Sequence, residues 1–193
     1  PSSGRRVWFD DGTVFDVDSI QIGDDGFVRL RSMWHSAGTK PAVVKLSRLN
    51  AIRLDPDRLL PLADLEPDRI EGPPTRYILP APKVLNPDAP LKLSSIEFRG
   101  PIIARFILPA GCQRFACEAV LPAGSMQWAD FEFIVHNNDE VVFRARLGPD
   151  NPVVTVNVPL TGSELTIELT EGEFGAVQDR VILEYPMLLL GQD

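Results

Sequence analysis

The stretch "QWADFEFIVHNNDEVVFRARL", residues 127–147, decides the fold because apolar and polar side chains alternate on both sides of a short polar loop. Successive side chains of a strand point to opposite faces of a sheet, so each half of this stretch predicts a strand with one buried face. We place the turn at 137–139, since an asparagine tolerates the left-handed backbone that a three-residue hairpin loop requires. The stretch is therefore predicted to be an antiparallel hairpin.

A three-residue loop also fixes which side chains of the hairpin face each other. The expected apolar partners are Phe131 with Ala145, Phe133 with Phe143 and Val135 with Val141, and the expected polar partners are Asp130 with Arg146, Glu132 with Arg144 and His136 with Glu140. A two-residue turn would set Phe133 against Arg144, and a slip of one residue exchanges the two faces of a strand. Every polar side chain of the hairpin then has a structural role, so we interpret His136 as structural and not catalytic.

The same alternation recurs from Leu91 to the end of the chain in eight stretches separated by Gly, Pro and Asn turns. They are "LKLSSIEFR", "IIARFIL", "CQRFACEAVL", "WADFEFIVH", "EVVFRARL", "PVVTVNVPL", "SELTIELT" and "DRVILEYPMLLL". Eight antiparallel strands predict a β-sandwich over residues 91–193, most simply a jelly roll. We expect Phe115, Cys117, Ala119, Leu121, Leu165, Ile167 and Leu169 to be buried, and Thr166, Glu168 and Thr170 to face water.

Two further regions precede the predicted sandwich. Residues 1–55 contain about five short alternating pieces with turns at Asp11-Gly12 and at "GDDG", residues 23–26, which predicts a small SH3-like or Sm-like β-barrel. Residues 56–90 hold half of the 18 prolines of the chain. Proline removes a backbone donor and restricts the residue before it, so we predict an extended connection with one helical turn at "LADLE". The fold class is all-β throughout.

Acidic side chains outnumber basic ones, 27 to 19, which gives the chain a formal net charge of -8. A polyanionic backbone repels such a chain, so we expect no DNA or RNA partner. No apolar run approaches the ~20 residues that cross a bilayer, so we expect no membrane insertion. The chain starts at Pro1 and not at a methionine, so a removed leader is compatible with it and the compartment stays open.

Cys112 and Cys117 are the only cysteines. Two cysteines are too few for a disulfide scaffold, and they lack the additional ligands that a structural zinc site needs. We favour a buried free thiol at Cys117 and a loop thiol at Cys112 over a local disulfide between them.

No catalytic motif stands out in the sequence. Neither His35 nor His136 accompanies a nucleophile motif such as G-x-S-x-G. A glycosidase needs only two carboxylates, which 27 acids always allow, but a small sandwich rarely carries a catalytic cleft of its own. The "GDDG" turn lacks the ligand spacing of a calcium loop. We therefore predict a chain that is not an enzyme and uses no metal and no cofactor.

Two tryptophans could bind a ligand. In "SMWHSAG", Trp34 and His35 are expected in a loop of the first domain, where the indole either caps the barrel, which we favour, or forms a binding platform. Trp128 begins a strand after the "PAGSMQ" turn. Its ring either stacks on the apolar face of a sugar or packs at the rim of the sandwich, and the sequence leaves both open.

Several patterns in residues 112–193 together resemble a known family. Phe133, Val135 and Asn138-Asp139 follow the hairpin pattern F-x-V-x-x-D-G. Leu160, Gly162, Leu165 and Ile167 follow the pattern L-x-G-x-x-x-L-x-L, with Leu165 one residue early. Asp179 to Leu183 follow the pattern D-x-x-x-W. These patterns resemble the NPCBM family of carbohydrate-binding modules, which implies a galactose-binding-like jelly roll. The upstream "LPLADLEP" and "APLKLSSIEFRG" resemble the lead-in found in planctomycete proteins, where a small β-barrel rich in "DG" turns often comes first.

The chain also departs from this family. "LPAGSMQ" replaces an acidic loop, Pro101 to Ile103 replace a G-x-x-x-H-S segment, and Leu183 replaces a tryptophan. These differences put an inherited calcium site and inherited sugar contacts in question. The resemblance implies a non-catalytic module that binds a polysaccharide or glycan, with Trp128, Asp179 and Arg180 nearest the ligand, and slightly favours an extracellular or periplasmic location. The alternative is a structural or protein-interaction module of a larger secreted or envelope assembly, whose sugar site has degenerated.

Overall fold

A computed structural model describes residues 5–32, 40–53, 58–73, 80–87, 89 and 93–191 of the 193-residue chain. The chain divides into two compact units, Pro1–Arg58 and Leu59–Asp193, and each is described by itself. Trp34 and His35 lie outside the described residues, so the choice between a cap and a platform stays a prediction.

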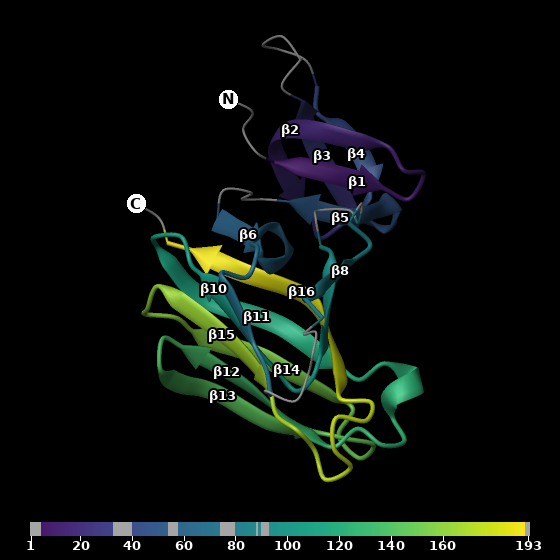
Figure 1. The fold of residues 1–193 in the computed structure, drawn as a ribbon. Coiled ribbons are helices and arrows are strands. Elements are labelled where there is room, and N and C mark those ends of the chain that lie inside the picture. Colours follow the sequence, from purple (N-terminus) through teal and green to yellow (C-terminus); the bar gives the residue numbers. More distant parts are fainter. Residues whose placement is uncertain are drawn as a thin grey trace. The chain divides into compact units, whose positions relative to one another are not determined.

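The first unit forms an antiparallel sheet of five strands in the order β4-β3-β2-β1-β5 (Figure 1). The strands are β1 (Arg6–Phe9), β2 (Val14–Ile22), β3 (Phe27–Ser32), β4 (Ala42–Lys45) and β5 (Leu49–Arg53), and a 3-10 turn, η1 (Leu46–Arg48), joins the last two. Gly12 and Gly26 have positive φ in the two predicted hairpin turns. The buried core is Val7, Phe9, Val17, Val28 and Leu30. The five strands are present as expected, and closure of the sheet into a barrel stays a prediction.

The second unit contains two antiparallel sheets (Figure 1). One has the order β13-β12-β15-β10-β7, and the other has the order β14-β11-β16-β9-β8 with β6 also paired to β16. The strands are β6 (Leu59–Pro61), β7 (Arg69–Glu71), β8 (Lys83–Leu85), β9 (Ser95–Arg99), β10 (Ile102–Ile107), β11 (Cys112–Val120), β12 (Phe131–Asn137), β13 (Glu140–Leu147), β14 (Val153–Pro159), β15 (Glu164–Leu169) and β16 (Arg180–Leu190). Strands β9 to β16 match the eight predicted stretches in order, and the all-β sandwich is confirmed.

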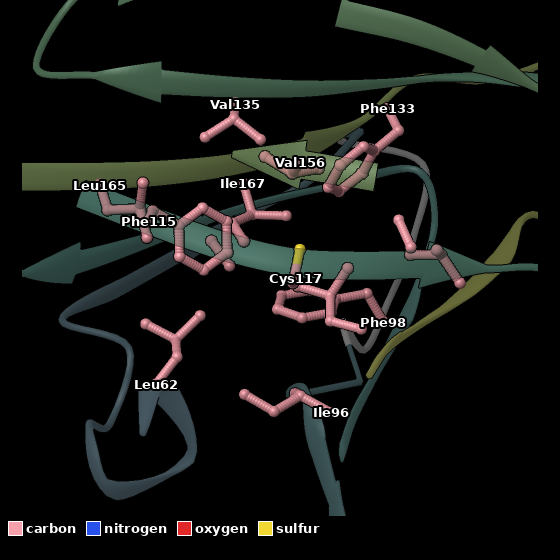
Figure 2. Close-up of a cluster of buried hydrophobic side chains, with 14 of the residues drawn as sticks. Leu62, Ile96, Phe98, Phe115, Cys117, Phe133, Val135, Val156, Leu165 and Ile167 are labelled. Atoms are coloured by element: carbon pink, nitrogen blue, oxygen red, sulfur yellow. The ribbon is translucent and has the colours of Figure 1, made fainter. Parts of the chain in front are cut away.

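The two sheets pack through an apolar layer that both supply (Figure 2). Phe115 on β11 and Phe133 on β12 are completely buried, although they belong to different sheets. Full burial of one such side chain stabilises the fold by about 1.5–3 kcal/mol. The predicted inward residues of β11 and β15 are all buried.

Thr166 on β15 was expected to face water but is buried. Strand β15 lies between β12 and β10, and Thr166 is directly opposite His136 on one side and Arg105 on the other. Long side chains on neighbouring strands therefore cover the outer face of this central strand, which alternation within a single strand does not reveal.

The prediction that residues 56–90 are an extended connection is wrong for the described part of this stretch. It contributes three short strands, with β6 paired to β16, β7 to β10 and β8 to β9. The predicted helical turn is present as η3 (Leu62–Asp64), and its Leu62 reaches into the core of the sandwich (Figure 2). Prolines allow these pairings because the strands are short and only one side of each needs backbone donors.

The hairpin of β12 and β13 has the predicted faces but a different register. Its turn is the two-residue Asn138-Asp139, with φ 53° at Asn138, and a bulge follows next to His136. The bulge adds one residue to one strand and so restores the correct faces. Val135 is therefore opposite Phe143 and Phe133 is opposite Ala145, each two positions away from the predicted partner.

Asn137 explains why the turn is shorter than predicted. Its Oδ1 accepts hydrogen bonds from the backbone N–H groups of Thr161 (2.7 Å) and Gly162 (2.9 Å), and its Nδ2 donates to the Glu164 carbonyl (2.9 Å). These bonds hold Asn137 in the strand as a buried residue, so it is not available for the loop.

Both cysteines are free and both are buried. Cys117 has its predicted place in the core (Figure 2). Cys112 is the first residue of β11 and not a loop residue, so that part of the prediction is wrong. Burial raises the pKa of each thiol, which disfavours the thiolate that reacts with oxidants.

We expect Leu62→Ala to lower the free energy of unfolding by about 2–4 kcal/mol, because it leaves a cavity in the sandwich core. Leu59 is the matched control, since its side chain is 43% exposed whereas that of Leu62 is completely buried. Leu59→Ala should cost less than about 0.5 kcal/mol. Urea unfolding followed by tryptophan fluorescence measures both, and equal effects would contradict the assignment of Leu62 to the core.

Candidate functional site

Two loops meet at one end of the sandwich and hold the predicted site residues Trp128 and Asp179, and Arg180 follows as the first residue of β16. The first, residues 121–130, joins β11 to β12 through the 3-10 turn η5 (Ala123–Ser125), and the second, residues 170–179, joins β15 to β16. A Cβ added to Gly172 would lie 1.7 Å from the Asp130 carbonyl oxygen. Only glycine permits so close an approach of two backbones, and Gly172 therefore keeps the loops together.

An exposed aromatic pair lies on these loops. The side chains of Trp128 and Phe174 are 42% and 49% exposed, and their ring centroids are 5.4 Å apart at an interplanar angle of 78°. This edge-to-face contact supports the indole ring and leaves aromatic surface open to solvent. The Trp128 backbone N–H donates to Oε1 of Gln178 (3.2 Å), which ties the pair to the second loop.

An open pocket lies among the same loops. Its volume is about 550 Å³, and it is lined by Asp130, Phe131, Glu132, Arg146, Thr170, Glu171, Gly172 and Glu173. Four carboxylates and one guanidinium therefore surround it. Asp130 in the lining is two positions after Trp128, and Glu173 directly precedes Phe174. The pocket and the aromatic pair therefore share both loops.

Two ion pairs were predicted across this hairpin, Asp130 with Arg146 and Glu132 with Arg144. Among the described residues, the structure contains the first of them. Arg146 donates to both carboxylate oxygens of Asp130, with Nη2 to Oδ2 at 2.6 Å, and the Glu173 N–H also donates to Oδ2 (3.4 Å). The hydrogen bonds from Arg146 lower the pKa of Asp130. The carboxylate is therefore charged at neutral pH and presents acceptor oxygens at the edge of the pocket.

Asp179 is buried and not exposed to a ligand. Only 2% of its surface is accessible, the Gly172 N–H donates to Oδ2 (3.3 Å), and Oδ1 has no hydrogen-bond partner among the described residues. Burial raises the pKa of Asp179 to about 6, which the nearby backbone amides of Gly172 and Asp130 only partly offset. This carboxyl group stabilises the second loop from its buried side through the hydrogen bond from Gly172.

Arg180 is occupied by an ion pair within the sandwich. Its Nε donates to Oε1 of Glu97 at 2.7 Å, and its Nη2 contacts the same oxygen. Glu97 is buried, which by itself raises its pKa, but hydrogen bonds from Arg180 and Arg99 outweigh burial and lower it. The guanidinium of Arg180 therefore neutralises a buried carboxylate that would otherwise be costly.

The structure thus exposes Trp128 beside the pocket, buries Asp179 and pairs the half-exposed Arg180 with Glu97. Sequence reasoning did not select Phe174, which contributes half of the aromatic pair. A phenylalanine in the glycine-containing loop "EGEFGA" has no strand neighbours to bury it, and this was the available signal.

Other polar groups of the described chain do not form a reactive cluster. Nε2 of His136 lies 2.8 Å from Oε2 of Glu168 on the adjacent strand, instead of opposite Glu140 as predicted. No three His, Cys, Asp or Glu side chains gather as metal ligands in the part of the chain that the structure describes. Among the same residues, no helix combines the length and the apolar character needed to pass through a bilayer.

Several solved structures with a similar fold contain CBM51 carbohydrate-binding modules. A CBM51 from Clostridium perfringens GH95, in complex with methyl-galactose, is 14% identical with a TM-score of 0.52, over 67% of this chain and 99% of that chain. The tandem CBM51 modules of Sp3GH98 from Streptococcus pneumoniae are 13% identical with a TM-score of 0.57, over 85% and 59%. CBM51-2 with GlcNAc and the INT domains of Clostridium perfringens ZmpB is 11% identical with a TM-score of 0.54, over 90% and 40%.

At these identities the likeness establishes the jelly-roll fold alone. No protein-family profile and no curated protein sequence matches the chain, so the NPCBM resemblance stays a prediction. The chain spans less than two thirds of the tandem and multidomain structures that it resembles.

The raised pKa of Asp179 predicts a pH dependence of stability. A carboxyl group with a pKa of about 6 when folded and 3.8 when unfolded takes up its proton more readily in the folded state. Its contribution is therefore fully present below pH 3.8 and is lost as the pH rises through 6. Between pH 4 and pH 7, wild type should lose up to about 3 kcal/mol relative to Asp179→Asn, which carries no titrating group there.

Denaturant unfolding of both proteins across this pH range measures the difference. Parallel pH profiles of the two proteins would show that Asp179 is solvated and does not hold the loop in the way described.

Proposed function

We propose that the second unit is a non-catalytic carbohydrate-binding module whose platform is the aromatic pair Trp128 and Phe174. The observation that carries the proposal is the exposure of both rings at the loop end of a jelly roll. Apolar surface that is contiguous, and not scattered as single side chains, often marks a ligand-binding site. The shared fold with CBM51 modules that were solved with methyl-galactose and with GlcNAc supports the same function.

The chemistry of the two loops suits a sugar. An indole ring offers a flat apolar surface for the C–H face of a pyranose, and carboxylates beside it accept hydrogen bonds from sugar hydroxyl groups. Asp130, Glu171 and Glu173 line the pocket next to the aromatic pair and are suited to this second role. A neutral glycan fits this set better than an anionic glycan, because four of the lining residues are acidic.

Asp179 and Arg180 act in this proposal as positioning residues and not as ligand contacts. Asp179 orients the loop that carries Phe174 through the Gly172 amide, and Arg180 fixes the start of β16 through Glu97. The burial of Asp179 and the ion pair that occupies Arg180 also favour the alternative function, a structural or protein-interaction module whose sugar site has degenerated.

For the first unit we propose an SH3-like barrel. The outer strands β4 and β5 are the two edges of the sheet, and the three-residue turn η1 joins them directly. A connection this short brings the two edges close to each other, which supports closure.

The test of the binding function is titration of the full chain with methyl-galactose and with GlcNAc, together with a glycan array for longer ligands. Trp128→Ala and Phe174→Ala should each weaken binding of the selected glycan by about tenfold, since each removes one stacking surface. Tyr185→Asn is the control, because Tyr185 is an exposed aromatic on β16 and asparagine tolerates its φ of 51°.

Equal loss in all three variants would mean that binding does not depend on the loop pair. Folded wild-type protein that binds no glycan on the array would remove the carbohydrate proposal and leave the interaction module.

A further inference from the structure

The first unit contains a second pocket that the carbohydrate site does not use. Its volume is about 370 Å³, and it is lined by Phe9, Asp11, Thr13, Phe15, Val17, Leu30, Arg31, Lys40, Ala42, Val44 and Arg48. Phe9, Val17 and Leu30 are core residues of the unit, so the pocket reaches down to the core. A volume of this size is at the lower end of the range for small-molecule sites.

An aromatic wall bounds this pocket. The Phe15 side chain is 51% exposed and lies edge-to-face against the nearly buried Phe9, with ring centroids 5.8 Å apart. Val44 and Ala42 on β4 supply aliphatic surface. The lining is therefore mainly apolar and requires a ligand with an aromatic or branched aliphatic body.

The charged groups of the lining are not balanced. Arg48 is already paired, with Nη2 3.1 Å from Asp10 and 3.0 Å from Asp11. Asp11 also accepts from the Thr13 N–H (2.9 Å), so its carboxylate is satisfied. Arg31 and Lys40, in contrast, form no ion pair with any residue in the described ranges.

Two cations without an ion-pair partner in the described ranges lie beside an apolar pocket, in a chain of net charge -8, and favour a ligand of opposite charge. We propose that this pocket binds a small organic acid, whose apolar body fills the space against Phe15, Leu30 and Val44 and whose carboxylate pairs with Arg31 and Lys40. This site is separate from the proposed sugar platform, and the two proposals can fail independently.

The test uses 4-phenylbutyrate as the acid and 4-phenylbutanamide as its neutral counterpart, titrated into the ¹⁵N-labelled full chain. The amide signals of Phe15, Leu30 and Val44 should shift with the acid and saturate. The acid should bind about fivefold more tightly than the amide, because charge-assisted contacts add to the apolar contacts that the two compounds share. Equal affinities, or shifts only outside the pocket, would overturn the proposal.

Two variants separate the apolar and ionic contributions. Ala42→Phe should abolish binding of both compounds by filling the pocket, and the exposed position of Ala42 makes the change compatible with folding. The double change Arg31→Gln and Lys40→Gln should remove the preference for the acid and leave the affinity for the amide unchanged. Arg29→Gln is the control, since Arg29 pairs with Asp25 and does not line the pocket.

Retention of the acid preference in the double variant would overturn the proposed ionic contact. If the same signals shifted with protein concentration alone, a second copy of the chain would be the occupant, and the proposal would be wrong.

Discussion

The apolar layer between the two sheets of the second unit determines where everything else in that unit lies. Phe98, Phe115 and Phe133 are completely buried in it, and each belongs to a strand that directs alternate side chains into this layer. Because this layer fixes the sheets, the loops at their ends can differ in sequence without loss of the core. The aromatic pair lies on two such loops, held together at Gly172, and a rigid sandwich therefore presents a small adaptable surface.

Period-two alternation was enough to predict strands β9 to β16 and the side chains that they direct into the core, because burial in the core acts on every second residue of a strand. It did not predict the short strands β6 to β8 or the burial of Thr166 on the outer face. It could not fix the hairpin register. That depended on Asn137, whose side chain bonds to Thr161, Gly162 and Glu164 far along the chain. Local turn rules treat an asparagine as a loop residue and contain no information on such distant partners.

Proline content was misleading for a related reason. It correctly indicates that residues 56–90 cannot form a long central strand, but three-residue edge strands need few backbone donors. The strand pairings of β6, β7 and β8 and the burial of Leu62 show that this stretch belongs to the sandwich. For the site, Trp128 was selected from its position after a turn. The burial of Asp179 depends on a close approach at Gly172, and the pairing of Arg180 depends on Glu97, which is 83 residues away in sequence, so local patterns reveal neither.

Strands β7 and β8 have a protective role that follows from their places in the sheets. Each is the outermost strand, covering β10 in one sheet and β9 in the other. A fragment that begins at residue 91 would lack β7 and β8. The backbone N–H and C=O groups on the outer edges of β10 and β9 would then be unpaired and could pair with strands of other molecules, which is how aggregation often begins. Solubility of the isolated sandwich therefore depends on a proline-rich segment whose composition is typical of a linker. A fragment designed to express the sandwich alone should begin before Leu59.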